Sequence, residues 1–300
     1  MRVVMALGGN ALLRRGEPLT EEVQRRNVKV AAEAVAQVAA LHQTIVTHGN
    51  GPQVGLLALA SEAYEEVPAY GLGVLGAESQ GMIGFLLEQA LRSRLPERSV
   101  ATLLTSVLVE PDDPGLARPT KPVGPVYREA VARSLGILRG WTVTRDGDGY
   151  RRVVASPQPQ EILELRAIRA VIDAGVLLIC AGGGGVPMVR RPDGELISVD
   201  GVVDKDLTSA LLAKDLQADV LLLLTDVSSV VRDWNTPQAQ PIGQATVAEL
   251  RALHLPEGSM GPKAEAACRF VERCGGRAVI GALSDAAAML DGSAGTQVLA

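Results

Sequence analysis

The sequence predicts an α/β fold in which a mainly parallel, open sheet is covered by helices on both faces, a three-layer αβα sandwich. Short apolar runs alternate with longer amphipathic stretches along the chain, and most apolar runs end in a glycine-rich or polar turn. The 300 residues, 47% of them hydrophobic, are enough for a substantial buried core. Because no repeat or low-complexity linker divides the chain, we expect a single domain over residues 1–300.

Apolar runs predict the strands of the sheet, at Val3–Leu7, Thr44–Thr47, Val100–Val109, Val176–Cys180, Val220–Leu224 and Ala278–Ala282. Amphipathic stretches predict helices, at Glu21–Leu41, Pro52–Tyr64, Ser79–Ser93, Pro159–Ala174, Leu207–Asp215 and Lys263–Glu272. In sheets of this kind, ligands bind where strands end and helices begin. The turns after these strands are therefore candidate binding loops.

One segment, residues 117–157, interrupts the alternation and is called the insert below. It carries three prolines, then a helix-like stretch, then two β-prone runs joined by Asp146-Gly147-Asp148-Gly149. An Asp-Gly turn between such runs favours a β-hairpin. We expect the insert to form a small subdomain that protrudes from the sheet, with the position of a lid.

Composition excludes several classes of function. A net charge of −5, a pI near 5.4 and 3% aromatic residues argue against a nucleic-acid partner. The cysteines Cys180, Cys268 and Cys274 have no spacing typical of a zinc site or a disulfide framework, so we expect a reduced, cytoplasmic setting and no protein-ligated metal. The apolar stretch at the N-terminus is too short to span a membrane, and we interpret it as the first strand.

Glycine loops follow the first two predicted strands. Glycine lets the backbone approach a ligand closely, and an adjoining helix start adds partial positive charge, so such loops favour anion binding. Ordinary strand-to-helix turns are the alternative interpretation. A glycine run that includes Gly183 and Gly184 follows a further apolar strand and also indicates close contact with a ligand. The residues expected to bind the anionic substrate are Gly8, Gly9, Asn10, Gly49, Asn50 and Gly51.

Lysine is rare in this chain: five of the 29 basic residues are lysines. Lys29 and Lys214 lie in helical patterns and are expected to face solvent. Lys121, Lys205 and Lys263 instead lie beside Pro, Asp or Gly at loops or helix starts. A lysine at a helix start opposes the helix dipole, which favours an anion nearby. A solvated surface charge remains the alternative for each of them.

Phosphoryl transfer fits this combination of residues. Lys205 precedes Asp206, which could hold the lysines in place, and no nucleophile, base or metal triad accompanies them. His48 could be proposed as a base, but such a site need not have one. The GxGxxG string at 71–76 follows no clear strand, and the chain has no P-loop. The residues suited to nucleotide contacts lie at a strand end and a helix start, with the glycine run: Thr225, Asp226, Val227, Met260, Gly261, Pro262, Gly183 and Gly184.

A set of longer strings carries a family resemblance: MALGGNALL, VTHGNGPQVG, ESQGMIGF, TKPVGP, RRVVASPQPQEI, AGGGGVP, VDKDLTSALLA, LLLLTDV, GSMGPKAEAA and GTQV. In this order, over nearly the whole chain, they resemble the carbamate kinases of the amino-acid-kinase family. The resemblance implies a reversible phosphotransferase acting on ATP and carbamate, with Mg²⁺ bridging the nucleotide phosphates, and a homodimer. It implies that residues from about 1 to 200 bind carbamate or carbamoyl phosphate and those from about 201 to 300 bind ATP or ADP.

The resemblance also implies residue roles. Lys205 and Lys263 would contact phosphoryl oxygens, Asp206 would organise them, and Lys121 would belong to the lid. The sequence departs from the family at Ser228–Val231, where relatives usually carry a glycine and a tyrosine. The departure concerns the residues expected to contact the nucleobase of the nucleotide. Two alternatives remain, namely another small-acid kinase of the same family, such as an acetylglutamate, aspartate, glutamate or UMP kinase, and a nucleotide-binding regulator without turnover.

Overall fold

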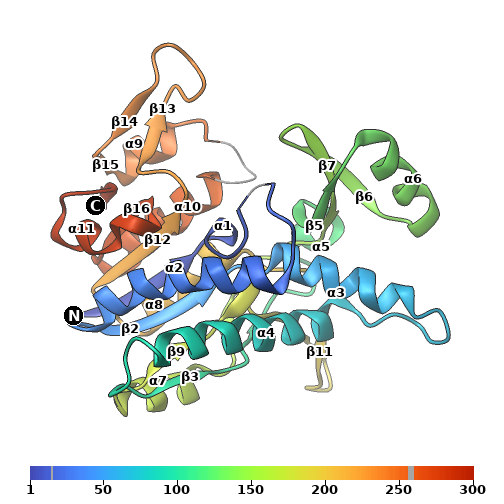
Figure 1. Ribbon diagram of the computed structural model, residues 1–300, viewed down its shortest axis with the longest axis horizontal. Helices are drawn as coiled ribbons and strands as arrows, with labels where there is room; N and C mark the ends of the chain where they lie inside the picture. The colour runs from blue at the N-terminus through green and yellow to red at the C-terminus, as the bar shows by residue number, and fades with distance from the viewer. Residues whose placement is uncertain (15, 256–259) are drawn as a thin grey trace.

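An eight-stranded sheet forms the centre of the computed structural model, which describes residues 1–14, 16–255 and 260–300 (Figure 1). Neighbouring strands are parallel except for the antiparallel pair β16 and β17, so the predicted mainly parallel sheet is confirmed. In spatial order the strands are β15 (Gln244–Thr246), β17 (Thr296–Leu299), β16 (Arg277–Ala282), β12 (Val220–Thr225), β1 (Arg2–Leu7), β2 (Gln43–His48), β9 (Leu177–Ile179) and β3 (Val100–Thr102).

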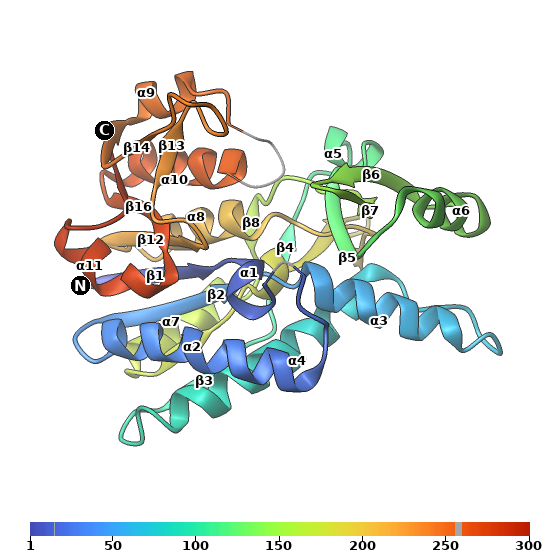
Figure 2. The same ribbon diagram turned by 45° about the horizontal axis from the view of Figure 1, so that its top comes forward.

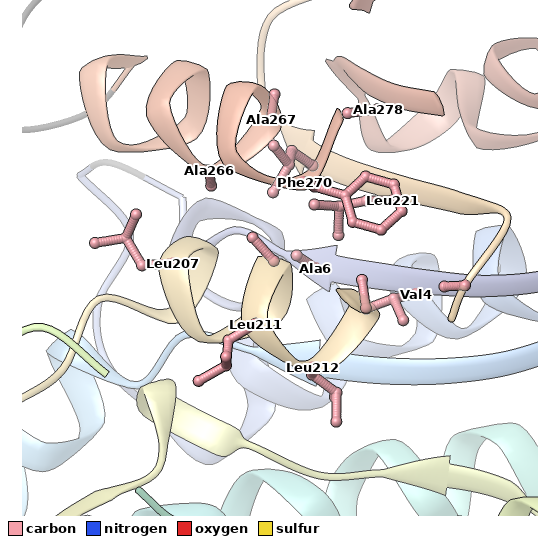
Figure 3. Packing of buried hydrophobic residues seen from close by; sticks show 14 of the residues in the cluster. Val4, Ala6, Leu207, Leu211, Leu212, Leu221, Ala266, Ala267, Phe270 and Ala278 are labelled. Carbon is pink, nitrogen blue, oxygen red and sulfur yellow. The ribbon is translucent and has the colours of Figure 1, made fainter. Parts of the chain in front are cut away.

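Two hydrophobic cores cover the two faces of this sheet. Alternate β1 residues face opposite sides: Met5 packs in the core with helices α2 (Glu21–Ala39), α4 (Leu72–Arg92) and α11 (Ala286–Asp291). Val4 packs in the other core with α7 (Leu165–Asp173), α8 (Lys205–Asp215) and α10 (Met260–Cys274). Figure 2 shows α2 and α10 on opposite sides of β1, and Figure 3 shows Phe270 of α10 beside Leu221 of β12. The three-layer prediction is therefore confirmed.

The prediction of one continuous strand at Val100–Val109 is wrong, because the chain leaves the main sheet after β3 and joins a second sheet at β4 (Ser106–Leu108). The buried Gln80 side chain donates to the carbonyl oxygen of Thr105 at 2.9 Å and accepts from its amide at 2.9 Å. A side chain thus satisfies the backbone groups that a continuous strand would pair. The second sheet has the order β11 (Leu196–Ser198), β10 (Val186–Arg190), β4 and β8 (Glu161–Ile162).

Two predicted helices start far from the expected residue, whereas the other starts differ little. The first begins at Leu72 rather than Ser79, because Asp200 accepts a hydrogen bond from the Leu72 amide at 2.8 Å, and a Cβ on Gly73 would lie 2.6 Å from the Ser198 side chain. The GxGxxG string thus opens α4 and lets it pack closely on β11. The second, predicted from Pro159, begins at Leu165, because β8 pairs with β4 before it.

The insert forms its own antiparallel sheet, apart from the main one. The order is β5 (Lys121–Tyr127), β7 (Gly149–Val154) and β6 (Thr142–Asp146), with helix α6 (Glu129–Arg139) between β5 and β6. Asp146 pairs with Gly149, which confirms the predicted hairpin. Figure 1 shows this sheet projecting from the molecule beside α3 (Gly51–Ala63).

The remaining elements are short. They are α1 (Gly9–Leu12), α5 (Pro114–Ala117), α9 (Val247–Ala252), the 3₁₀ turns Gly182–Gly184 and Leu283–Asp285, and the hairpin of β13 (Val230–Arg232) with β14 (Gln240–Ile242). Over the part of the chain that the structure describes, no helix is long and apolar enough to cross a membrane.

Candidate functional site

Two of the predicted binding loops lie against each other at the carboxyl ends of β1, β2 and β12. The Gly8 amide donates to the carbonyl oxygen of Leu224 at 3.0 Å, and the Gly49 amide donates to that of Leu7 at 3.1 Å. A Cβ on Gly49 would lie 3.3 Å from the Gly9 nitrogen, and one on Gly8 would lie 2.9 Å from the Leu224 oxygen. Side chains there would force the strand ends apart, so glycine keeps the two loops in contact.

A buried charge cluster adjoins these loops. Asp204 caps α8 by accepting from the Asp206 amide at 2.8 Å, which sets the direction of the first turn. The Asp206 carboxylate then pairs with two ammonium groups, Lys205 Nζ at 2.5 Å and Lys263 Nζ at 2.9 Å. The carboxylate therefore links the start of α8 to the first turn of α10, the arrangement expected of a residue that organises both lysines.

Burial and ion pairing shift the pKa values of the residues in this cluster. Burial lowers the pKa of Lys205 to about 8, against the opposing effect of Asp206. Burial alone would lower the pKa of Lys263, but the charge and hydrogen bond of Asp206 and the nearby carboxylates together raise it. Although burial opposes its charge, the two lysines hold the pKa of Asp206 well below its ordinary value. Near neutral pH the cluster carries two ammonium groups and one carboxylate, so it has excess positive charge to offer an anion.

The cluster and the glycine loops form one site. The Cδ of Lys205 lies 3.6 Å from the point where a Cβ on Gly49 would be, so its stem runs along the second loop. Backbone amides and a desolvated ammonium group are thus close together, as stabilisation of a transferring phosphoryl group requires.

Lys121 reaches the same region from the insert. It begins β5, and its Nζ lies 2.5 Å from Oδ2 of Asp204, a residue 83 positions away in the sequence. Sequence reasoning gave Asp204 no role. The Asp before a helix start signals a cap, but the pairing with Lys121 is a tertiary contact without a local pattern.

The glycine run after β9 packs beside the substrate loops. A Cβ on Gly183 would lie 2.2 Å from the side-chain nitrogen Nδ2 of Asn50, and one on Gly184 would lie 2.6 Å from the backbone carbonyl oxygen of Val203. Both glycines have positive φ. The Asn50 side chain in turn donates to Ser79 Oγ at 2.7 Å. The structure therefore places Gly183 and Gly184, which were predicted as nucleotide contacts, against Asn50 and the α8 cap.

The other predicted nucleotide residues lie on the α10 side of the site. Thr225 ends β12, and its Cα is 3.7 Å from the position of a Cβ on Gly8. Asp226 and Val227 follow it, while Met260, Gly261 and Pro262 form the α10 turn that carries Lys263. The Gly258 and Ser259 of the resemblance lie outside the described residues, as does the side chain of Asn10.

His48 has the properties of a structural residue. Burial lowers its pKa to about 4, so the ring is neutral near pH 7. Its Nδ1 lies 3.1 Å from the carbonyl oxygen of Gly49. A neutral ring with its proton on Nδ1 can donate a hydrogen bond to that oxygen. It therefore supports the Gly49 loop.

No protein metal centre is seen across residues 1–14, 16–255 and 260–300, where no three His, Cys, Asp or Glu side chains are grouped as metal ligands. A nucleotide-bound Mg²⁺ does not need such a cage, since Mg²⁺ in kinase sites is held by one or two carboxylates together with substrate phosphates.

Comparisons with known proteins agree with this geometry. Residues 1–282 match the amino acid kinase family. A carbamate kinase of Rhizobium meliloti is 54% identical over 99% of this chain and 92% of its own length, and one of Haemophilus influenzae is 48% identical over 99% and 96%. The solved carbamate kinase of Giardia lamblia bound to AMP-PNP is 39% identical, covers 99% of this chain and 98% of its own, and has a TM-score of 0.89. The chain therefore belongs to the amino acid kinase family and, within it, to the carbamate kinases.

Proposed function

We propose that the protein catalyses reversible phosphoryl transfer between ATP and carbamate, giving ADP and carbamoyl phosphate. The observation that carries this is the buried Lys205–Asp206–Lys263 cluster beside two glycine loops at one edge of the sheet. The similarity to carbamate kinases over the full chain supports the choice of substrate.

The proposed chemistry needs no base. A carbamate oxygen attacks the γ-phosphorus, the bond to the bridging oxygen of ADP breaks, and ADP leaves with that electron pair. The attacking oxygen of carbamate is already deprotonated, so no base is needed to activate it, and a neutral, buried His48 is consistent with this. Lys205 and Lys263 would stabilise charge on the phosphoryl oxygens while backbone amides hold the group in line.

We assign the smaller substrate to the loops after β1 and β2 and the nucleotide to the residues after β12 and at the start of α10. Residues from about 1 to 200 would then form the carbamate lobe and those from about 201 to 300 the nucleotide lobe. The insert would act as a lid that carries Lys121. Gly183 and Gly184 support the substrate loop in this assignment, since their contacts are with Asn50 and the α8 cap.

We further propose that the nucleotide is used as its Mg²⁺ complex, with the phosphates as the principal ligands. Lys205 and Lys263 would neutralise phosphate charge that the ion leaves exposed. We also infer a cytoplasmic location, which the unpaired Cys180, Cys268 and Cys274 support.

A homodimer is proposed as the assembly. Exposed apolar side chains include Val74 and Phe85 on α4 and Leu104 just after the edge strand β3. Exposed apolar groups of this kind favour burial against a second copy.

The deciding experiment is ATP formation from ADP and carbamoyl phosphate, run beside acetyl phosphate, with amino-acid and UMP acceptors in the reverse direction. Carbamoyl phosphate is expected to give the highest kcat/KM. If it were inert while another substrate reacted, the protein would be a different small-acid kinase. Binding of ADP without any turnover would indicate the regulator instead.

A further inference from the structure

Arg151 of the insert stands out as a largely buried cation outside the lysine cluster. It lies in the centre of β7, and its side chain is 16% exposed. Nη1 donates to Asp146 Oδ2 at 3.2 Å, which ties one side of the guanidinium to the neighbouring strand β6. Nε is buried and has no hydrogen-bond partner among the described residues. A buried donor without a partner is uncommon in proteins and calls for an explanation.

The guanidinium adjoins the start of α3. Nη2 lies 3.8 Å from the point where a Cβ on Gly51 would be, and the carbonyl oxygen of Pro122 lies 3.3 Å from the same point. Asn50 precedes α3 without a side-chain cap, so the first-turn amides of this 13-residue helix are not capped by it. Arg151 and the positive end of α3 therefore converge beside the glycine loop.

The remaining edge of the guanidinium suits a planar oxygen ligand. Nη1 donates to Asp146 and Nε is covered, so Nη2 is the donor that can reach a carboxylate-like oxygen. Lys121 comes from the paired strand β5 and contacts Asp204 at the α8 cap. The lysines thus lie on the α8 side, and Arg151 lies on the α3 side.

We propose that Arg151 is a substrate-binding residue that holds the carbamoyl oxygen of carbamoyl phosphate, or a carboxylate oxygen of carbamate, at the start of α3. This inference rests on the proposed function and adds to it the residue that orients the carbamoyl group. Arg151 would leave the phosphoryl oxygens to the lysines and fix the planar end of the substrate for in-line transfer. Since Nε is covered, Nη2 is the atom that contacts the substrate.

Kinetics of Arg151→Met and Arg151→Lys test this assignment. The Met variant is expected to raise the KM for carbamoyl phosphate about 10-fold or more, with the KM for ADP within about two-fold of wild type. The Lys variant keeps the charge but loses the planar fork, so its KM should fall between the two. Arg145→Met is the matched control, because Arg145 is an exposed arginine of the same hairpin and should leave both constants unchanged.

Binding of phosphonoacetamide, a non-transferable analogue of carbamoyl phosphate, separates this inference from the proposed function. In calorimetry with ADP present, wild type and Arg145→Met should bind the analogue alike, and Arg151→Met should bind it at least 10-fold more weakly. This result would support the assignment even if wild type failed to turn over carbamoyl phosphate. Equal analogue affinity in all variants, no binding by wild type, or a parallel loss of ADP affinity in Arg151→Met would overturn it.

Discussion

At the residue scale, Asp206 decides the character of the site, because its two carboxylate oxygens hold Lys205 and Lys263 from different helices. Lysines brought this close would repel each other without the intervening carboxylate. A buried carboxylate without its lysines would also be costly. The three residues therefore function as one unit, and removal of any member affects the others.

Lys205→Ala is expected to lower kcat by about 10²-fold or more, the usual loss when one preorganised charge-stabilising group is removed. Asp206→Asn should also be impaired, because the lysines lose their common partner. ADP affinity, measured by calorimetry, should change far less. Lys214→Ala is the control, since Lys214 lies in the same helix with its side chain 37% exposed. Near-normal turnover in both cluster variants would refute the assignment.

The pH dependence follows from the lowered pKa of Lys205. Its positive charge is present below about pH 8 and is lost as the pH rises through that value, so kcat/KM for carbamoyl phosphate should fall there. The Asp206 carboxylate opposes the lowering, so Asp206→Asn should move the fall to lower pH. Rate measurements from pH 6 to pH 10 check this expectation. A fall at the same pH in both enzymes would contradict it.

At the scale of elements, the insert is positioned by close contact with α3. A Cβ on Gly55 would lie 2.1 Å from Gly124 Cα, so the strand β5 rests directly on the helix backbone. On the outer side, Glu62 of α3 pairs with Arg139 at 2.5 Å and with Arg152 at 3.4 Å. Both arginines also lie over the Trp141 ring, at 5.1 and 4.8 Å from its centroid. These contacts hold the insert against α3, so that Lys121 and Arg151 are kept beside the site.

Lys121→Ala is expected to raise the KM for carbamoyl phosphate and to lower kcat/KM by an amount equivalent to about 1–3 kcal/mol, the scale of a charge-assisted contact. The physical reason is that Lys121 would leave Asp204 and contact the substrate when the insert closes. ADP affinity without the second substrate should stay within a few-fold of wild type. Equal weakening of both ligands, or of neither, would reject the lid assignment.

At the scale of the whole molecule, helix α4 carries a large apolar side chain on its exposed side. On α4, Leu87 is fully buried, whereas Phe85 is 58% exposed. A large aromatic side chain in that position gives up its hydrophobic contribution unless another surface covers it.

Phe85→Arg is therefore expected to dissociate the proposed homodimer. Light scattering after size exclusion should give wild type about twice the chain mass of 31.4 kDa and the variant about that mass itself. Leu138→Arg on α6 is the control, because Leu138 is also an exposed apolar residue, 80% exposed, but lies on the insert. A monomeric wild type, or dissociation by the control alone, would refute this interface.

The sequence by itself determined the layered α/β architecture, the hairpin of the insert and the residues of the charge cluster. Side-chain periodicity, turn chemistry and helix starts act over a few neighbouring residues, so their patterns can be read along the chain. Rare lysines among many arginines added a signal of the same local kind.

Tertiary structure alone decided the break at Thr105, the start of α4, the pairing of Lys121 with Asp204 and the place of Arg151 beside Gly51. Each depends on groups far apart in sequence, for example Asp200 capping Leu72 from 128 residues away. No local pattern specifies such contacts, because they arise only when the packed layers bring the groups together and burial makes an unpaired polar group costly.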